Sequence, residues 1–142
     1  MKKRILLLPL LAASLLAMAP AAQAAVVADI ELVNATINAN GVVRVVGEVT
    51  CPAGYQVQRT RASIDQQVST GGEDLESSVK HFKNQVNCTG SADRFVVRFA
   101  ESTGGDQFQP GELTEVDLFF TACQPQPDGQ CVSAEDVSTV VL

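Results

Sequence analysis

Four cysteines, Cys51, Cys88, Cys123 and Cys131, are the residues of this sequence best suited to chemistry. Thiols bind zinc, attack electrophiles or pair as disulfides, and their spacing helps to distinguish these uses. The gaps between these cysteines are wide, no Cys-x-x-Cys motif occurs, and the chain has one histidine. The pattern therefore disfavours a metal site, and the even number of cysteines favours two disulfides, for which three connectivities exist.

Nucleophilic and acid–base catalysis find little support in the other residues. His81 is the single imidazole, and strand alternation places it opposite the inward Phe82, on the solvent side. The chain has no Gly-x-Ser-x-Gly elbow and no phosphate-binding loop. The acidic residues that could act in pairs form three clusters: Glu73, Asp74 and Glu76; Glu112, Glu115 and Asp117; Glu135 and Asp136. We interpret these clusters as solvated surface and predict a protein that is not an enzyme and uses no cofactor. A calcium site within residues 65–76 stays open as an alternative, without an Asp-x-Asp-x-Asp spacing to support it.

The N-terminal residues follow the order of a secretory signal. Three basic residues at positions 2–4 precede an apolar run from Ile5 to Met18, and Ala22-Gln23-Ala24 then offers a small-x-small cleavage site. The apolar run has about 14 residues, fewer than the roughly 20 that a bilayer-spanning helix needs. We therefore predict that residues 1–24 are a signal peptide, with a retained membrane anchor as the alternative. Residues 25–142 are predicted to form one secreted domain, extracellular or periplasmic.

The exported chain is predicted to be strongly acidic. Without the first 24 residues, seven basic residues remain against sixteen acidic ones, a net charge of −9. Such a surface repels nucleic acid, and no second apolar segment follows the signal. We therefore expect no nucleic-acid binding and no membrane span in the exported chain.

Two-residue alternation of apolar and polar residues dominates the chain after the signal and predicts strands. We expect seven of them, at 26–37, 42–51, 55–64, 79–88, 94–100, 112–123 and 131–142. The third changes parity between Val57 and Ala62, which one inserted residue, a β-bulge, would reconcile. Residues 65–78 are expected to form a loop or a poorly ordered edge. The fold class that follows is all-β, a seven-stranded antiparallel immunoglobulin-like sandwich with two disulfides, with a closed barrel as the alternative.

The alternation also predicts which side chains fill the core. In the first strand Val33, Ala35 and Ile37 share one face. The inward side chains of the later strands are expected to be Val43, Val45, Val49, Cys51, Phe82, Val86, Cys88, Phe95, Val97, Phe99, Val116, Leu118, Phe120 and Ala122.

An immunoglobulin-like topology also constrains the cysteines. In this topology the connections after strands two, four and six lie at one end, and each cysteine lies next to one of these connections. Strand two pairs antiparallel with strand five, which brings the end of strand two beside the chain that leads into strand five. The expected disulfides are therefore Cys51–Cys88 and Cys123–Cys131, gathered at a single end of the molecule.

The segment between Cys123 and Cys131 is the most distinctive loop of the sequence. Its residues are Gln124, Pro125, Gln126, Pro127, Asp128, Gly129 and Gln130. Two prolines and a disulfide would make it rigid, and a preorganised loop binds with a smaller loss of entropy. We predict a binding loop here, with a stable turn that has no partner as the alternative.

The cysteine-bearing motifs resemble those of a largely uncharacterised group of small secreted bacterial immunoglobulin-like β-sandwich proteins. The matching pieces are Gly47-Glu48-Val49-Thr50-Cys51, Cys88-Thr89-Gly90, Phe108-Gln109-Pro110-Gly111 and Cys123…Cys131. This resemblance implies export and the sandwich fold, and it implies no activity or catalytic residues. The stretch from Asn40 to Gly47 is also similar to the neocarzinostatin-type apoproteins, secreted seven-stranded sandwiches that carry an enediyne chromophore. Both bridges of those proteins close short loops, whereas Cys51 and Cys88 are far apart here.

The sequence thus predicts a secreted, non-enzymatic binding module that recognises a protein, glycan or envelope component through its disulfide-bearing end. Two alternatives stay open. One is a small-molecule carrier of the neocarzinostatin type, which requires a cleft between the sheets. The other is an inhibitor of a secreted enzyme that presents the loop between Cys123 and Cys131.

Overall fold

The computed structural model of the protein describes residues 27–67, 74–101, 105–127 and 129–142. The predicted signal peptide, residues 1–24, lies outside the described residues, as does Asp128 of the predicted binding loop. In the part of the chain that the structure describes, no helix is long and apolar enough to cross a bilayer.

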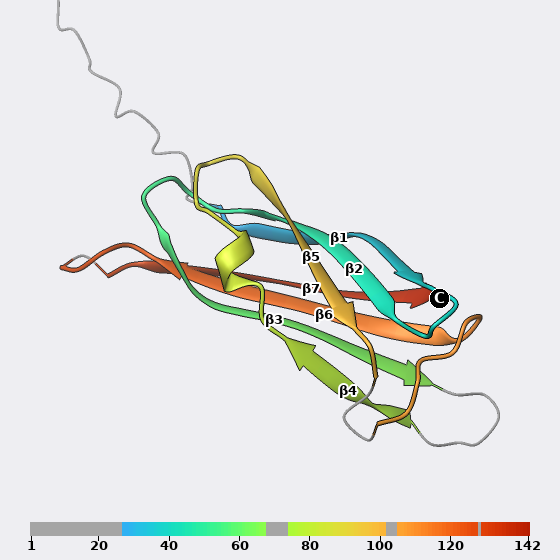
Figure 1. Ribbon diagram of the computed structural model, residues 1–142. Helices are drawn as coiled ribbons and strands as arrows, with labels where there is room; N and C mark the ends of the chain where they lie inside the picture. Colours follow the sequence, from blue (N-terminus) through green and yellow to red (C-terminus); the bar gives the residue numbers. More distant parts are fainter. Residues whose placement is uncertain (1–26, 68–73, 102–104, 128) are drawn as a thin grey trace, which may run out of the picture.

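The described chain forms seven antiparallel strands in two sheets (Figure 1). The three-stranded sheet has the order β1-β2-β5 and consists of β1 (Asp29–Ile37), β2 (Val43–Thr50) and β5 (Ala92–Phe99). The four-stranded sheet has the order β4-β3-β6-β7 and consists of β4 (Asp74–Lys80), β3 (Gln56–Gln67), β6 (Leu113–Cys123) and β7 (Cys131–Val141). A short 3-10 helix, η1 (Lys83–Gln85), lies between β4 and β5. The predicted all-β fold with seven strands is confirmed, and its two separate ladders form a sandwich-like pair of layers rather than one closed barrel.

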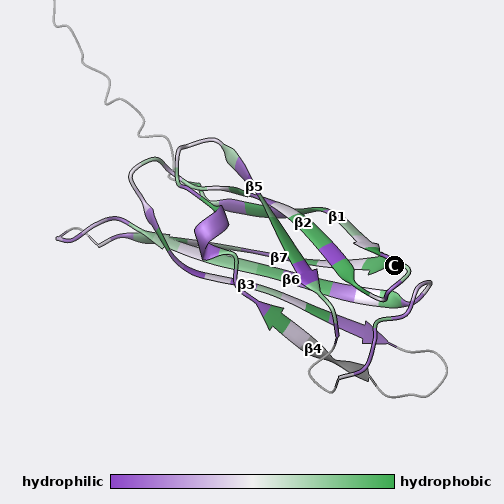
Figure 2. Ribbon diagram, in the orientation of Figure 1, coloured by the Kyte–Doolittle hydropathy of each residue, from purple (hydrophilic) through white to green (hydrophobic). Residues whose placement is uncertain are grey.

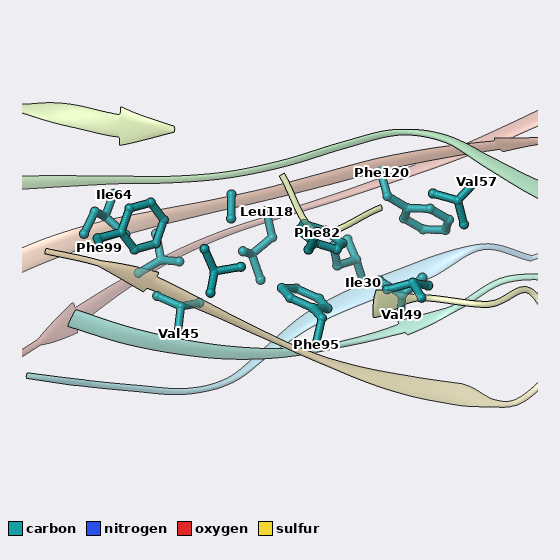
Figure 3. Close-up of a cluster of buried hydrophobic side chains, with 14 of the residues drawn as sticks. Ile30, Val45, Val49, Val57, Ile64, Phe82, Phe95, Phe99, Leu118 and Phe120 are labelled. Carbon is teal, nitrogen blue, oxygen red and sulfur yellow. The ribbon is translucent and has the colours of Figure 1, made fainter. Parts of the chain in front are cut away.

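The core lies between the two sheets, because alternate side chains of each strand turn inward. Figure 2 shows the alternation as successive apolar and polar segments along the strands. The predicted inward residues of β2, β5 and β6 are all buried. In Figure 3 Phe82 and Phe95 lie between the layers, and their rings stack with centroids 3.8 Å apart. A Cβ added at Gly47 would lie 2.3 Å from Cζ of Phe95, so the ring of Phe95 needs a glycine at this position.

Three register shifts interrupt the ladders of the described strands, and two of them bear on the predictions from the sequence. The predicted bulge in the third strand is confirmed, because the register between β3 and β6 shifts between Val57 and Arg59. A second bulge in β1, between Leu32 and Asn34, was not predicted. It separates Val33, which is 40% exposed, from the half-buried Ala35 and Ile37. Grouping Val33 with these two residues was therefore wrong.

The fourth strand was predicted in the wrong place. The structure extends β3 to Gln67 and starts β4 at Asp74, within the stretch expected to be a loop or edge, whereas Lys83–Gln85 of the predicted strand 79–88 form η1. β4 lies at the edge of its sheet, and its sequence, DLESSVK, lacks regular apolar alternation. Phe82 and Val86 are buried as expected. The 3-10 turn between them accounts for a burial pattern that resembles that of a strand.

Strands β1 and β7, from different sheets, run close together along one side of the molecule. The carboxylate of Asp136 in β7 accepts a hydrogen bond of 2.6 Å from the backbone N–H of Leu32, next to the bulge in β1. The hydroxyl of Ser138 donates to the other carboxylate oxygen of Asp136, 3.0 Å away. A backbone donor of β1 beside the bulge is thereby bound by a side chain of the opposite sheet.

Candidate functional site

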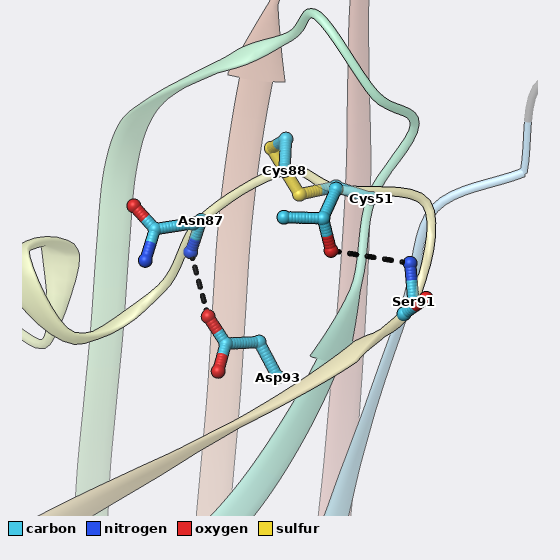
Figure 4. Close-up of a disulfide and its surroundings, with 6 residues drawn as sticks. Cys51, Asn87, Cys88, Ser91 and Asp93 are labelled. Atoms are coloured by element: carbon cyan, nitrogen blue, oxygen red, sulfur yellow. Dashed lines mark hydrogen bonds between the residues drawn. A yellow bond between two sulfur atoms is a disulfide. The ribbon is translucent and has the colours of Figure 1, made fainter.

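The first disulfide joins the residue that follows β2 to the segment between η1 and β5. Cys51 and Cys88 are bonded with their Cα atoms 4.9 Å apart (Figure 4). Cys51 is only 1% exposed and belongs to the core, whereas Cys88 is half-buried. The backbone N–H of Gly90 donates to the carbonyl of Cys51 at 3.0 Å, and that of Asn87 donates to the carboxylate of Asp93 at 2.9 Å. These bonds fix the segment that leads from η1 into β5.

The second disulfide closes the hairpin between β6 and β7. Cys123 and Cys131 are directly opposed in the ladder, and their Cα atoms are 4.0 Å apart. The N–H of Gln124 donates to the carbonyl of Gln130 at 2.8 Å, which extends the hairpin by one further pair. Within the described residues, the segment beyond this pair is therefore short and held at both ends.

The loop beyond the second disulfide presents its side chains to solvent. Pro125, Gln126, Pro127 and Gln130 are exposed. Gly129 has a φ of 56°, and a Cβ at this position would lie 3.1 Å from Nε2 of Gln126. Both the left-handed backbone and the nearby amide favour glycine here. The hairpin extends past the rest of the sandwich in Figure 1.

Both disulfides lie at the same end of the sandwich, as predicted. Gln56, at the start of β3, is paired with Cys123 in the ladder, and β3 begins five residues after Cys51. Three connecting segments lie at this end (Figure 1): the turn between β2 and β3, the segment between η1 and β5, and the hairpin between β6 and β7. The expected pairings, Cys51–Cys88 and Cys123–Cys131, are both confirmed, and no free cysteine remains.

A shallow depression lies beside the first disulfide. Its volume is about 340 Å³, and its lining residues are Tyr55, Gln56, Val57, Lys83, Asn84, Val86, Asn87 and Cys88. Tyr55, Val57 and Val86 form an apolar floor, since each is less than 10% exposed. The exposed Lys83, Asn84 and Asn87 form a polar rim. An apolar floor with a polar rim is the usual composition of a surface that binds another molecule.

The other residues considered for chemistry are dispersed. His81 is exposed, as predicted, and its Nδ1 contacts the backbone carbonyl of Thr60. Asp117 and Glu135 both approach the guanidinium of Arg61, at 2.7 Å and 3.7 Å. Among the described residues, no group of three or more histidine, cysteine, aspartate or glutamate side chains is arranged to hold a metal ion. Residues 68–73, including Glu73, lie outside the described residues, so the calcium alternative for residues 65–76 stays untested.

The sequence did not single out one cluster on the outer face of the four-stranded sheet. Arg61, Phe119 and Glu135 are successive ladder partners across β3, β6 and β7. These residues are distant in the sequence, and only the register of the strands brings them side by side. The sequence offered one signal for this cluster: Arg59 and Arg61 are two residues apart, so they are expected on the same face of β3.

Comparison with family models, with curated proteins and with solved structures gives no match for this chain. The function must therefore be argued from the geometry of the protein itself.

Proposed function

We propose that this chain is an exported, non-enzymatic binding module that recognises a partner protein through its disulfide-bearing end. The observation that carries the proposal is the meeting of three connecting segments and both disulfides at one end, beside a depression with an apolar floor. The predicted signal peptide and the two disulfides support export, because disulfides persist in oxidising compartments.

The rigidity of the hairpin loop supports a binding role. Cys123 and Cys131 are covalently joined, and Gln124 is hydrogen-bonded to Gln130 directly above them. Pro125 and Pro127 further restrict the backbone between these two fixed points. A loop that is already ordered loses little conformational entropy when a partner binds, so more of the contact energy contributes to affinity.

The strand order supports an immunoglobulin-like classification, which we include in the proposal. Constant-type immunoglobulin sandwiches have strands one, two, five and four in one sheet and three, six and seven in the other, with loops clustered at the two ends. This chain keeps β1-β2-β5 together and β3-β6-β7 together, but its β4 pairs with β3. Several sandwiches of this architecture bind their partners through the loops of one end. The antibody-type core is not present here, because the chain has no tryptophan and its disulfides lie at strand ends.

The packed interior does not favour the carrier alternative. Inward side chains that are at most 1% exposed fill the space between the sheets (Figure 3), among them Val45, Phe95, Phe99, Leu118 and Phe120. A carrier for an apolar molecule needs a concave apolar cavity in this region. The inhibitor alternative uses the same loop as our proposal, so it differs only in the identity of the partner.

The test replaces the loop and preserves the disulfide. Residues 124–130 are exchanged for a Gly/Ser segment of the same length between Cys123 and Cys131. The unchanged protein, used as bait in the culture medium and envelope fraction, identifies the partner, and calorimetry then measures the Kd for both forms. We expect the exchange to weaken binding at least tenfold.

A matched control lies at the opposite end of the sandwich. Ala39 and Asn40, in the turn between β1 and β2, are exposed, and their exchange for Gly-Ser should leave the Kd unchanged. Equal affinity of the loop-exchanged and unchanged proteins, or an equal loss in the control, would refute the proposal. Inhibition of a secreted hydrolase by the unchanged protein alone would identify the partner as an enzyme.

A further inference from the structure

The outer face of the four-stranded sheet holds a second hollow, away from the loop just described. Its volume is about 380 Å³, and its lining residues are Arg59, Thr60, Arg61, His81, Phe119 and Glu135. Three elements of the sheet, β3, β6 and β7, contribute to it, together with His81, which follows β4. Because the floor is a hydrogen-bonded sheet, the side chains are held on a rigid support.

Two arginines line this hollow in a chain that is otherwise acidic. Seven lysines and arginines follow the predicted signal, and two of them, Arg59 and Arg61, lie side by side on the outer face of β3. The only histidine of the sequence, His81, lines the same hollow. A net charge of −9 already provides solubility, so solubility does not account for basic side chains gathered at one place.

Arg61 is held in place before any ligand binds. Its Nη2 is 2.7 Å from Oδ2 of Asp117 and 3.7 Å from Oε1 of Glu135. Its guanidinium carbon lies 5.8 Å from the centre of the Phe119 ring. The Nε of Arg61 and Oδ1 of Asp117 are enclosed and have no hydrogen-bond partner among the described residues.

Arg59 supplies a charge, and His81 supplies a ring nitrogen, that a ligand can use. Arg59 is exposed, and the structure gives its guanidinium no ion-pair or hydrogen-bond partner among the described residues. His81 uses Nδ1 in its contact with the carbonyl of Thr60, which leaves Nε2 for another group. The guanidinium of Arg59 suits a carboxylate. Because a carbonyl only accepts, Nδ1 of His81 is the donor in its contact with Thr60, and Nε2 suits a hydroxyl donor.

Glu135 and Phe119 distinguish between classes of anion. Glu135, whose side chain is 55% exposed, repels a compact anion such as phosphate but accepts hydrogen bonds from hydroxyl groups. Phe119 is half-buried, and its ring offers an apolar surface to C–H groups. A ring that carries hydroxyls, C–H groups and one carboxylate satisfies all of these side chains.

We propose that this hollow, formed by Arg59, Arg61, His81, Phe119 and Glu135, binds a carboxylate-bearing sugar residue. Arg59 contacts the carboxylate, Nε2 of His81 and the carboxylate of Glu135 accept from hydroxyl groups, and Arg61 with Phe119 forms the surface on which the ring lies. The site is separate from the hairpin loop, so it does not depend on the function proposed above.

The experiment titrates the purified, oxidised protein with trigalacturonate and follows binding by calorimetry and by NMR chemical shifts. We expect a Kd below 1 mM, on the order of the weaker specific complexes, with shifts centred on Arg61, His81 and Phe119. Arg59→Ala should weaken binding at least fivefold. The matched control is Arg98→Ala, which removes an exposed arginine from the other sheet and should leave the Kd unchanged.

Three comparison ligands make the result decisive. The methyl ester of the same trisaccharide should bind at least tenfold more weakly, because it lacks the carboxylates. Inorganic phosphate and a hexaglutamate peptide should not compete at equal concentration. Equal competition by either one, an equal effect of Arg98→Ala, or no shift at Phe119 would overturn the assignment to an acidic sugar.

Discussion

At one end of the sandwich disulfides hold the connecting segments, whereas at the other end a buried amide does so. Gln66, near the end of β3, is fully buried. Its Nε2 donates to the carbonyl of Gln109 at 2.9 Å and to the hydroxyl of Thr114 at 3.0 Å, and its Oε1 accepts from the N–H of Gln109 at 2.7 Å. Phe108, 1% exposed, anchors the same segment in the core.

The two ends differ in how their connecting segments are held in place, and the residues of each segment explain the difference. The segment between β5 and β6 includes a large apolar side chain, Phe108, that can be buried. The hairpin between Cys123 and Cys131 consists of glutamine, proline, aspartate and glycine, and its two prolines are exposed. A loop that buries no apolar side chain cannot be fixed by burial, so a covalent bond is the remaining means of fixing it.

Removal of the first disulfide should have the largest effect on stability. Cys51→Ser combined with Cys88→Ser should lower the free energy of unfolding by about 4 kcal/mol, because the bridge closes a loop with a sequence separation of 37. Urea denaturation of the oxidised proteins measures the difference. The unchanged protein in excess reductant is the control and should lose at least as much. A loss below about 1 kcal/mol would contradict the importance of this bridge.

Loss of the buried amide should come next. Gln66→Ala leaves the N–H and the carbonyl of Gln109 without their partners, and we expect a loss of about 3 kcal/mol. The neighbouring exposed Gln67 provides the control, since Gln67→Ala should change the free energy by no more than about 0.5 kcal/mol. If both variants are equally stable, the amide does not hold this end of the molecule.

Removal of the second disulfide should have the smallest effect of the three. Cys123→Ser with Cys131→Ser opens a loop with a sequence separation of only 8, for which we expect a loss of about 2.5 kcal/mol. The ladder of β6 and β7 stays available to hold the hairpin. Denaturation under the same conditions gives the ranking, and a loss larger than that of the first bridge would reverse the comparison.

Regular alternation explains why much of the fold could be predicted from the sequence. In β2 and β6 one face is apolar without interruption, so residues such as Val45 and Leu118 could be assigned to the core directly. The cysteines followed from these strands, because the topology places Cys51, Cys88 and Cys123 near connections at one end. Even the bulge in β3 could be predicted, since it reverses the parity between Val57 and Ala62.

The predictions that were wrong concern residues whose partners lie across the sheet or in the other sheet. β4 packs on one neighbour only, so its side chains carry no strict pattern. Next to the bulge at Val33, the N–H of Leu32 donates to Asp136, which is distant in the sequence and lies in the opposite layer. The hollow at Arg61 and Glu135 likewise arises from strand register, which local alternation does not determine.

Gln85 binds the backbone of β5, the strand at one edge of the three-stranded sheet. Its side-chain amide donates to the carbonyl of Val96 at 3.0 Å and accepts from the N–H of Val96 at 2.9 Å, as a neighbouring strand would. An uncovered edge strand invites pairing with another molecule. By occupying both backbone groups of Val96, this single glutamine leaves the edge at β5 less open to pairing with another strand.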